Sequence, residues 1–225
     1  MKINNYNRRY WPVLIIFITL GAYNSTFGLL AVACMIAPVL TAFFKGRMWC
    51  GRFCPRGSFF DHVLARLGDR NRRIPQLLKK TWMRWIIFIS LMTYMGFNLY
   101  IAEKSIYGIG AVLFKMVIIT TVFGVLLGYL FAPRSWCKIC PMGTLAMIAG
   151  RGAKVPLVIK SSECRLCGIC ARNCPLEIPV HSFRDVGIVE DPDCLKCGVC
   201  ISSCPVTALK LEDKNESRGA VEIYS

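Results

Sequence analysis

The chain contains the run Cys164-x-x-Cys167-x-x-Cys170-x-x-x-Cys174-Pro175 and repeats it as Cys194-x-x-Cys197-x-x-Cys200-x-x-x-Cys204-Pro205. The two runs are offset by 30 positions, since 194 minus 164 is 30. Gly168 and Gly198 precede the third cysteine of each run, and an acid, Glu163 or Asp193, precedes the first. A repeat of this kind indicates two copies of one structural unit.

A [4Fe–4S] cube offers one iron corner to each of four thiolates, and three closely spaced cysteines on a tight loop can reach three corners. The spacing resembles that of bacterial two-cluster ferredoxins, in which the last cysteine of each run ligates the other cluster. The resemblance implies two cofactors and two ligand sets. These sets are Cys164, Cys167, Cys170 and Cys204 for cluster 1, and Cys194, Cys197, Cys200 and Cys174 for cluster 2.

Zinc sites and disulfides are the alternatives for these eight cysteines. Zinc ribbons use pairs of Cys-x-x-Cys, and not a triplet followed by Cys-Pro. Disulfides require an oxidising compartment. The spacing therefore favours iron–sulfur clusters.

Charge is divided unevenly along the 225 residues, of which 55% are hydrophobic. Residues 1–160 hold 21 Lys and Arg against 3 Asp and Glu, whereas residues 161–225 hold 7 against 10. The first part is therefore +18 and the second −3, for a total of +15. Because the basic residues flank long apolar runs, we expect membrane lipid, and not nucleic acid, as the partner of this charge.

Four apolar segments are expected to cross a membrane, at roughly 11–24, 26–44, 85–101 and 109–131. The first two come from one uncharged stretch of 34 residues, which is long for a single crossing of about 20 residues. One long tilted helix is the alternative. The loop 45–84 is strongly basic, so the positive-inside rule places it, and with four crossings both termini, in the cytoplasm.

Two single residues stand out within these segments. Lys115 is expected to snorkel toward the interface, with a functional role as the alternative. Cys34 lies alone on an apolar face, which predicts a small buried hydrophobic residue.

Two shorter cysteine motifs follow the second and the fourth apolar segment. They read Trp49-Cys50-Gly51-Arg52-Phe53-Cys54-Pro55-Arg56-Gly57 and Trp136-Cys137-Lys138-Ile139-Cys140-Pro141-Met142-Gly143. If the two helices pack together, these four thiols would converge at the inner membrane surface. They could ligate a further Fe–S centre or form a redox-active dithiol. The alternative is that they are small residues in turns where a proline stops the helix.

The whole pattern, over about residues 10–210, resembles the polyferredoxin membrane proteins of the NapH, NosR and CcoG type. Cys50-x-x-x-Cys54-Pro55 fits the Cys-x-x-x-Cys-Pro motif of those families, whereas Cys137-x-x-Cys140-Pro141 is one residue shorter. The resemblance implies electron transfer between the quinol pool, or a cytoplasmic donor, and a partner redox protein. It also implies a subunit of the quinol dehydrogenase type, and not a stand-alone enzyme.

The predicted fold is an α-helical membrane protein with a C-terminal α+β domain. A transmembrane domain of four helices would occupy 1–153, a two-[4Fe–4S] ferredoxin domain 154–213 and a loose tail 214–225. The expected location is the inner membrane. Two other functions remain open: a CcoG-like factor that reduces or passes a metal through the membrane-edge thiols, and a redox-sensing membrane anchor.

Quinol chemistry would need a proton acceptor near the interface. The candidates are Asp61, His62 and Glu103. The simpler interpretation of Asp61 and Glu103 is a solvated charge at the end of a helix. His62 could equally be a haem ligand, and His181, between the two cysteine runs, is most simply a surface residue.

Overall fold

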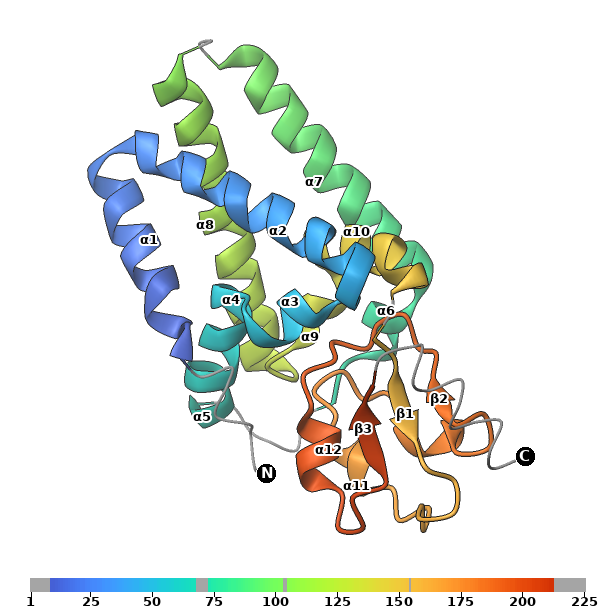
Figure 1. The fold of residues 1–225 in the computed structure, drawn as a ribbon. Helices are drawn as coiled ribbons and strands as arrows, with labels where there is room; N and C mark the ends of the chain where they lie inside the picture. The colour runs from blue at the N-terminus through green and yellow to red at the C-terminus, as the bar shows by residue number, and fades with distance from the viewer. Residues whose placement is uncertain (1–8, 68–72, 103–104, 154, 213–225) are drawn as a thin grey trace.

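The computed structural model describes residues 9–67, 73–102, 105–153 and 155–212. It has a helical part, over 11–152, and a smaller part with a sheet, over 157–211 (Figure 1). The predicted loose tail over 214–225 lies outside the described residues, as does Glu103.

The first apolar stretch forms two helices and not one. Helix α1 (Trp11–Tyr23) leads through the 3₁₀ turn η2 (Ser25–Leu29) into α2 (Leu30–Lys45). Asn24 separates them because its backbone is extended and its side chain accepts a hydrogen bond from the N–H of Thr26 at 3.0 Å. Such local capping by Asn ends one helix and starts the next.

Helices α7 (Thr81–Ile101) and α8 (Ile106–Leu130) form the second long pair. Helix α7 begins four residues before the predicted segment at 85, and this extra turn contains Arg84, which is buried. The hydropathy of the sequence could not detect this extra turn, because the turn contains the charged Arg84 and the polar Thr81.

Among the described residues, three segments are long and apolar enough to cross a membrane: Ser25–Lys45, Thr81–Ile101 and Ile106–Leu130. They expose large apolar side chains such as Leu40, Phe97 and Phe123, as lipid-facing helices do. Helix α1 has 13 residues, or about 20 Å at ~1.5 Å per residue, against a hydrocarbon core of about 30 Å. The fourth crossing therefore stays a prediction.

Two single-residue predictions in these segments have different outcomes. Cys34 is exposed on α2, so the prediction of a buried residue is wrong. The buried side of α2 is a narrow stripe of Ala31, Pro38 and Ala42, and Cys34 lies beside it. Lys115 is exposed on α8, where its long side chain is free of the helix packing, as snorkelling requires.

Short helices at the lower end of α2 and α8 carry the shorter cysteine motifs (Figure 1). The first motif forms α3 (Met48–Arg52) and α4 (Pro55–Phe59), followed by the π-helical turn η3 (Phe60–Leu64), α5 (Ala65–Leu67) and, further on, α6 (Gln76–Lys79). The second motif forms α9 (Ser135–Ile139) and α10 (Pro141–Ala149), which ends in the 3₁₀ turn η4 (Gly150–Gly152).

The smaller part is built on an antiparallel sheet with the order β2-β1-β3. Strand β1 (Leu157–Ile159) lies in the middle, between β2 (Ile188–Val189) and β3 (Leu209–Leu211). Two short helices, α11 (Ile169–Arg172) and α12 (Val199–Ser203), and the 3₁₀ turn η5 (Val180–Phe183) pack with this sheet. Its core is apolar, and the cysteines of both long runs pack against that core.

We call the helical part, over 11–152, the membrane part. A close backbone contact within it joins η2 to α8. A Cβ at Gly28 would overlap the carbonyl oxygen of Gly110, and a Cβ at Gly110 would overlap the carbonyl oxygen of Ser25. Glycine is needed here because backbone atoms face each other directly, as in close helix contacts within membranes.

We expect Gly110→Ala to lower stability by about 1–3 kcal/mol, the usual cost of overpacking, because the backbone of η2 cannot move aside locally. Gly96→Ala is the matched control, since no described atom lies within 4 Å of a Cβ built at Gly96. Thermal unfolding in detergent should show a lower Tm for Gly110→Ala alone. Equal Tm values would contradict the close contact.

Candidate iron–sulfur centres

The two long cysteine runs repeat in backbone conformation as well as in sequence. Among the described residues, the non-glycine residues with positive φ are Leu166, Glu177, Lys196 and Thr207, at 49° to 55°. They form two pairs, 166 with 196 and 177 with 207, with the same offset of 30 as the cysteines. Gly168 and Gly198 are left-handed at matching positions and cap α11 and α12. Such conformations cost energy outside glycine, so they indicate loops shaped around something.

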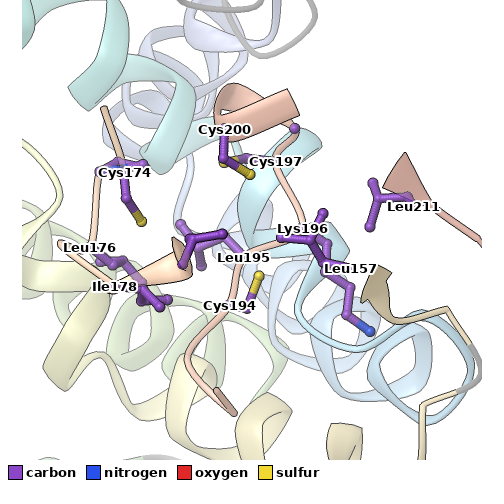
Figure 2. Close-up of a pocket in the computed structure, with 13 residues that line it drawn as sticks. Leu157, Cys174, Leu176, Ile178, Cys194, Leu195, Lys196, Cys197, Cys200 and Leu211 are labelled. Atoms are coloured by element: carbon purple, nitrogen blue, oxygen red, sulfur yellow. The ribbon is translucent and has the colours of Figure 1, made fainter. Parts of the chain in front are cut away.

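Each loop encloses a hollow lined by cysteines from both runs. Figure 2 shows the first hollow, where the sulfurs of Cys174, Cys194, Cys197 and Cys200 face a shared space. The second hollow is lined by Cys164, Cys167, Cys170 and Cys204. We call the hollow lined by Cys174, Cys194, Cys197 and Cys200 hollow 2, because it contains the predicted ligands of cluster 2. The hollow lined by Cys164, Cys167, Cys170 and Cys204 is hollow 1. The structure thus brings together the two predicted four-cysteine sets, with the last cysteine of each run exchanged. Ligation itself stays a prediction.

The surroundings of these sulfurs suit an iron–sulfur cluster. The backbone N–H groups of Leu176 and Ile178 hydrogen-bond to Cys174, and that of Lys196 to Cys194. Burial raises the pKa of the Cys194 thiol to about 12, despite that bond. A thiolate here therefore needs a cationic partner, which iron provides, and N–H donors to sulfur are the usual means of tuning a cluster.

The arrangement of the cysteines differs from that of a site for a single metal ion. Among the described residues, no group of three or more His, Cys, Asp or Glu is arranged to hold one ion. A zinc site would bring its ligands to one centre, whereas each thiolate of a cluster binds a different iron.

His181 differs from its expected role. It is half-buried and lines hollow 1, so the prediction of a simple surface residue is wrong. Its Nδ1 is buried and has no hydrogen-bond partner among the described residues. The η5 turn, which the sequence did not indicate, brings this ring back to the cysteines of the first run. An unpaired ring nitrogen beside a cluster site fits a sulfur partner supplied by that cluster.

The two shorter motifs have equivalent local structures despite their different lengths. The N–H of Cys54 donates to the carbonyl of Trp49, and the N–H of Cys140 to that of Trp136, each at 2.9 Å. The extra residue, Phe53, also donates to Trp49 at 2.9 Å, so it widens the last turn of α3. Cys54 and Cys140 then cap helices that begin with proline. The one-residue difference therefore does not prevent equivalent positions.

Crossed arginines join these two motifs. Arg47 lies two residues before Trp49, and Arg134 two residues before Trp136. Arg47 donates from Nη2 to the carbonyl of Cys137 at 2.8 Å, and Arg134 donates from Nη1 to the carbonyl of Cys50 at 2.9 Å. Each arginine thus binds the opposite motif. The motifs are therefore held face to face, with their cysteines close enough to influence one another electrostatically.

Glycines at equivalent positions make room for the crossed arginines. A Cβ at Gly57 would lie 2.6 Å from Nη1 of Arg134, and a Cβ at Gly143 would lie 2.6 Å from Nη2 of Arg47. The last glycine of each Cys-Pro-x-Gly motif is explained by this contact. The two arginines were not among the predicted site residues, although the repeated Arg-x-Trp-Cys pattern marks both of them in the sequence.

The two arginines have different acidic partners. Arg134 forms a bidentate pair with Asp61, at 2.8 Å from Nε and 2.6 Å from Nη2. Asp61 is therefore not the solvated charge that the sequence suggested, and its carboxylate is engaged by a guanidinium. His62, its neighbour, stacks on Trp11 with ring centroids 4.9 Å apart, which gives it a packing role between η3 and α1.

Arg47 pairs instead with Asp193, the residue before the second long cysteine run. Asp193 receives Arg47 at 2.8 Å, Arg84 at 2.6 Å and Lys138 at 2.7 Å. Burial favours the neutral acid, but the positive charges of Arg47, Lys138 and Arg84 outweigh it and lower the pKa of Asp193. The Asp193 carboxylate is therefore one ionic link between the membrane part and the smaller part, and the pair of Lys79 with Glu177 at 2.7 Å is a second one.

The membrane-edge cysteines are half-buried and lie beside cationic side chains. Burial raises the pKa of the Cys50 thiol to about 12 and also raises that of Cys137. Arg134 lies 3.8 Å from the sulfur of Cys137. The buried Nε of Arg47 has no hydrogen-bond partner among the described residues. A nearby orphaned donor and four thiols fit a sulfide-containing centre, which would accept from N–H groups and stabilise the thiolates.

Comparisons with known proteins place the family match on this membrane edge. A family model described as a 4Fe-4S binding domain matches residues 27–75 and 114–157. These ranges contain Cys50, Cys54, Cys137 and Cys140 and do not contain the eight cysteines of the long runs. The match therefore falls on the two shorter cysteine motifs.

Two curated proteins resemble parts of the chain. An uncharacterized protein of Methanocaldococcus jannaschii is 26% identical over 148 residues, which is 64% of this chain and 58% of that protein. YccM of Escherichia coli, described as a candidate electron transport protein, is 35% identical over 66 residues, which is 29% of this chain and 18% of YccM. The chain thus spans less than two thirds of either relative. No solved structure matches it. The findings support a 4Fe–4S protein of the ferredoxin type.

We expect Arg134→Gln to destabilise the protein by about 3–5 kcal/mol, since it removes a buried guanidinium that pairs with the half-buried carboxylate of Asp61. It should also lower the iron bound per chain, because the carbonyl of Cys50 loses its donor. Arg66→Gln is the matched control, because Arg66 is exposed on α5, a few residues after Asp61 in the chain. Iron analysis and Tm measured on the same anoxic preparations check this. Identical iron content and Tm in both variants would contradict the role of the crossed arginines.

Proposed function

We propose that this chain is a membrane-bound iron–sulfur electron-transfer protein. The observation that carries the proposal is that three sets of cysteines, those of hollow 1, of hollow 2 and of the membrane edge, have members that pack against one apolar core. The cysteines Cys50 and Cys137 pack against the same apolar core as those of the long runs. Clusters bound there would accept and donate single electrons with little ligand movement. The 4Fe–4S family match and the description of YccM add support.

The chain's own residues would contribute binding and insulation. Buried Leu176, Ile178 and Leu195 cover the inner side of hollow 2, which excludes water from its sulfurs. The backbone N–H groups at Cys174 and Cys194 would stabilise negative charge on a reduced cluster. Exclusion of water and fixed donors are the properties that set a cluster potential.

More specifically, we propose a NapH-like relay between the quinol pool, or a cytoplasmic donor, and a partner redox protein. The basic loop, the membrane-edge cysteines and the smaller part all lie at the same end of the long helices (Figure 1). The positive-inside rule would place that end in the cytoplasm. A chain with four crossings in the inner membrane would then have both termini there.

The alternative of a CcoG-like maturation or reduction factor rests on the membrane-edge thiols acting as reactive groups. Their environment favours ligation instead. A reactive cysteine has a lowered pKa, whereas burial raises the pKa of both Cys50 and Cys137. A redox-sensing anchor is the other alternative, and it differs from a relay because it needs no steady turnover.

The proposal is tested by iron and sulfide analysis with EPR on anoxically purified protein, before and after addition of a quinol. We expect iron–sulfur signals that the quinol or a low-potential donor reduces. Colourless protein without iron would reject the proposal. Clusters that no quinol and no soluble donor turn over would favour the sensor.

We expect Cys200→Ser to lower the iron content by about four atoms per chain, because it removes a ligand of one cube. Cys34→Ser is the matched control, since Cys34 is exposed on α2 and belongs to none of the three sets. Iron, sulfide and EPR spin counts check this. A relay should lose electron transfer in Cys200→Ser, whereas a thiol-based maturation factor should keep activity there and lose it in Cys50→Ser.

A further inference from the structure

The two hollows differ in what they face. Cys167 of hollow 1 is exposed, and its neighbour Leu166 is 51% exposed. In hollow 2, Cys200 is buried, and the loop that carries Cys194 and Cys197 packs on the membrane part. A cluster in hollow 1 would thus be accessible to a protein in solution, whereas a cluster in hollow 2 would lie at an internal junction.

The loop of hollow 2 touches the first membrane-edge motif directly. A Cβ at Gly51 would overlap the carbonyl oxygen of Leu195 and would lie 3.2 Å from the Cβ of Cys197. Gly51 follows Cys50 in the chain. One glycine therefore separates a cysteine of the membrane edge from a cysteine of hollow 2, with no side chain between the two backbones.

Asp193 fixes this contact in place. Its partners come from three places in the membrane part: Arg47 before α3, Arg84 in α7 and Lys138 in α9. Arg47 also binds the carbonyl of Cys137, so one guanidinium joins the membrane edge to the residue before Cys194.

The equivalent residue of the other repeat has no such role. Glu163 lies 30 positions before Asp193 and pairs with Lys160 on the surface at 3.1 Å, with side chains about 40% exposed. The two repeats share their cysteine spacing but differ at this acid. At this position the second repeat contacts the membrane part and the first does not, although Glu177, just after the first run, reaches Lys79 at 2.7 Å.

We propose that Asp193 and Gly51 are positioning residues that hold cluster 2 against the membrane-edge centre, so that electrons pass in the order membrane edge, cluster 2, cluster 1, or the reverse. The inference rests on the proposed function. Each step moves one electron: one centre is oxidised as its neighbour is reduced, and no bond or proton is exchanged. Two partners would exchange electrons with the ends of this row. A quinol at the membrane edge would give up two electrons one at a time and release two protons to solvent as it becomes a quinone, and a redox protein at the exposed Cys167 side would accept the electrons.

The test uses the full anoxic protein in lipid nanodiscs, mixed rapidly with reduced methyl viologen and sampled by rapid-freeze EPR. The variants are Asp193→Asn and Gly51→Ala. Their matched controls are Glu163→Gln and Gly152→Ala, the latter because no described atom lies within 4 Å of a Cβ built there. The Cys200→Ser protein, which lacks cluster 2, identifies the signal of that cluster, and iron counts verify that the Asp193→Asn and Gly51→Ala proteins and their controls retain their clusters.

We expect cluster 1 to be reduced first, then cluster 2, then the membrane-edge centre. Asp193→Asn and Gly51→Ala should slow the last step several-fold, because the rate of electron transfer falls steeply with the distance between the two centres. The earlier steps should keep their rates, and the spin interaction between cluster 2 and the membrane edge should weaken. Both controls should match the unaltered protein.

Several results would overturn the inference. These are reduction of the membrane-edge centre before cluster 2, unchanged transfer rates in both variants, or iron for two cubes only with no third centre. If Asp193→Asn loses cluster 2 during assembly, Gly51→Ala still decides the matter, because it leaves every charge in place. Unaltered protein that exchanges electrons with neither viologen nor quinol would instead reject the proposed function.

Discussion

A buried carboxylate surrounded by cations is the interaction on which the assembly of this protein depends. Asp193 receives Arg47, Arg84 and Lys138 within 2.8 Å. Any of these charges alone would be costly to bury, so each requires the others. Without the smaller part, Arg47 and Arg84 would lie beside each other with no carboxylate between them; without the membrane part, Asp193 would stay in water. The two parts therefore complete one another electrostatically, and the site at their junction exists only when both are folded.

The membrane edge has an approximate twofold design that this carboxylate breaks. Arg47 and Arg134 cross to opposite motifs and fit against equivalent glycines. One arginine is neutralised within the membrane part, by Asp61, and the other by the smaller part. The two motifs are therefore arranged symmetrically, but only Arg47 connects them to the smaller part. This connection gives the three cysteine sets an order, with the membrane edge at one end and hollow 1 at the other. That polarity is what a directional relay requires, whereas a store of iron would have no use for it.

Local backbone strain serves the same purpose in the smaller part. Leu166 and Lys196 adopt left-handed conformations that cost about 1–2 kcal/mol each outside glycine. They turn the chain tightly enough to place N–H groups and cysteines on one wall. The penalty is tolerated because an apolar core beneath, including Leu176 and Leu195, fixes the loops. Bound clusters would stabilise them further, which couples cofactor binding to the fold of this part.

Sequence by itself determined whatever depends on neighbours along the chain: the apolar segments, the break at Asn24 and the two cysteine repeats. Tertiary structure alone decided the rest. Arg47 and Asp193 are 146 positions apart, and no local pattern states that they meet. For the same reason Asp61 was taken for a solvated charge and His181 for a surface residue, since burial and pairing depend on elements folded over them. The spacing of residues in the sequence determines which side chains a loop can bring together. Only the packing of the folded chain determines which other residues those side chains contact.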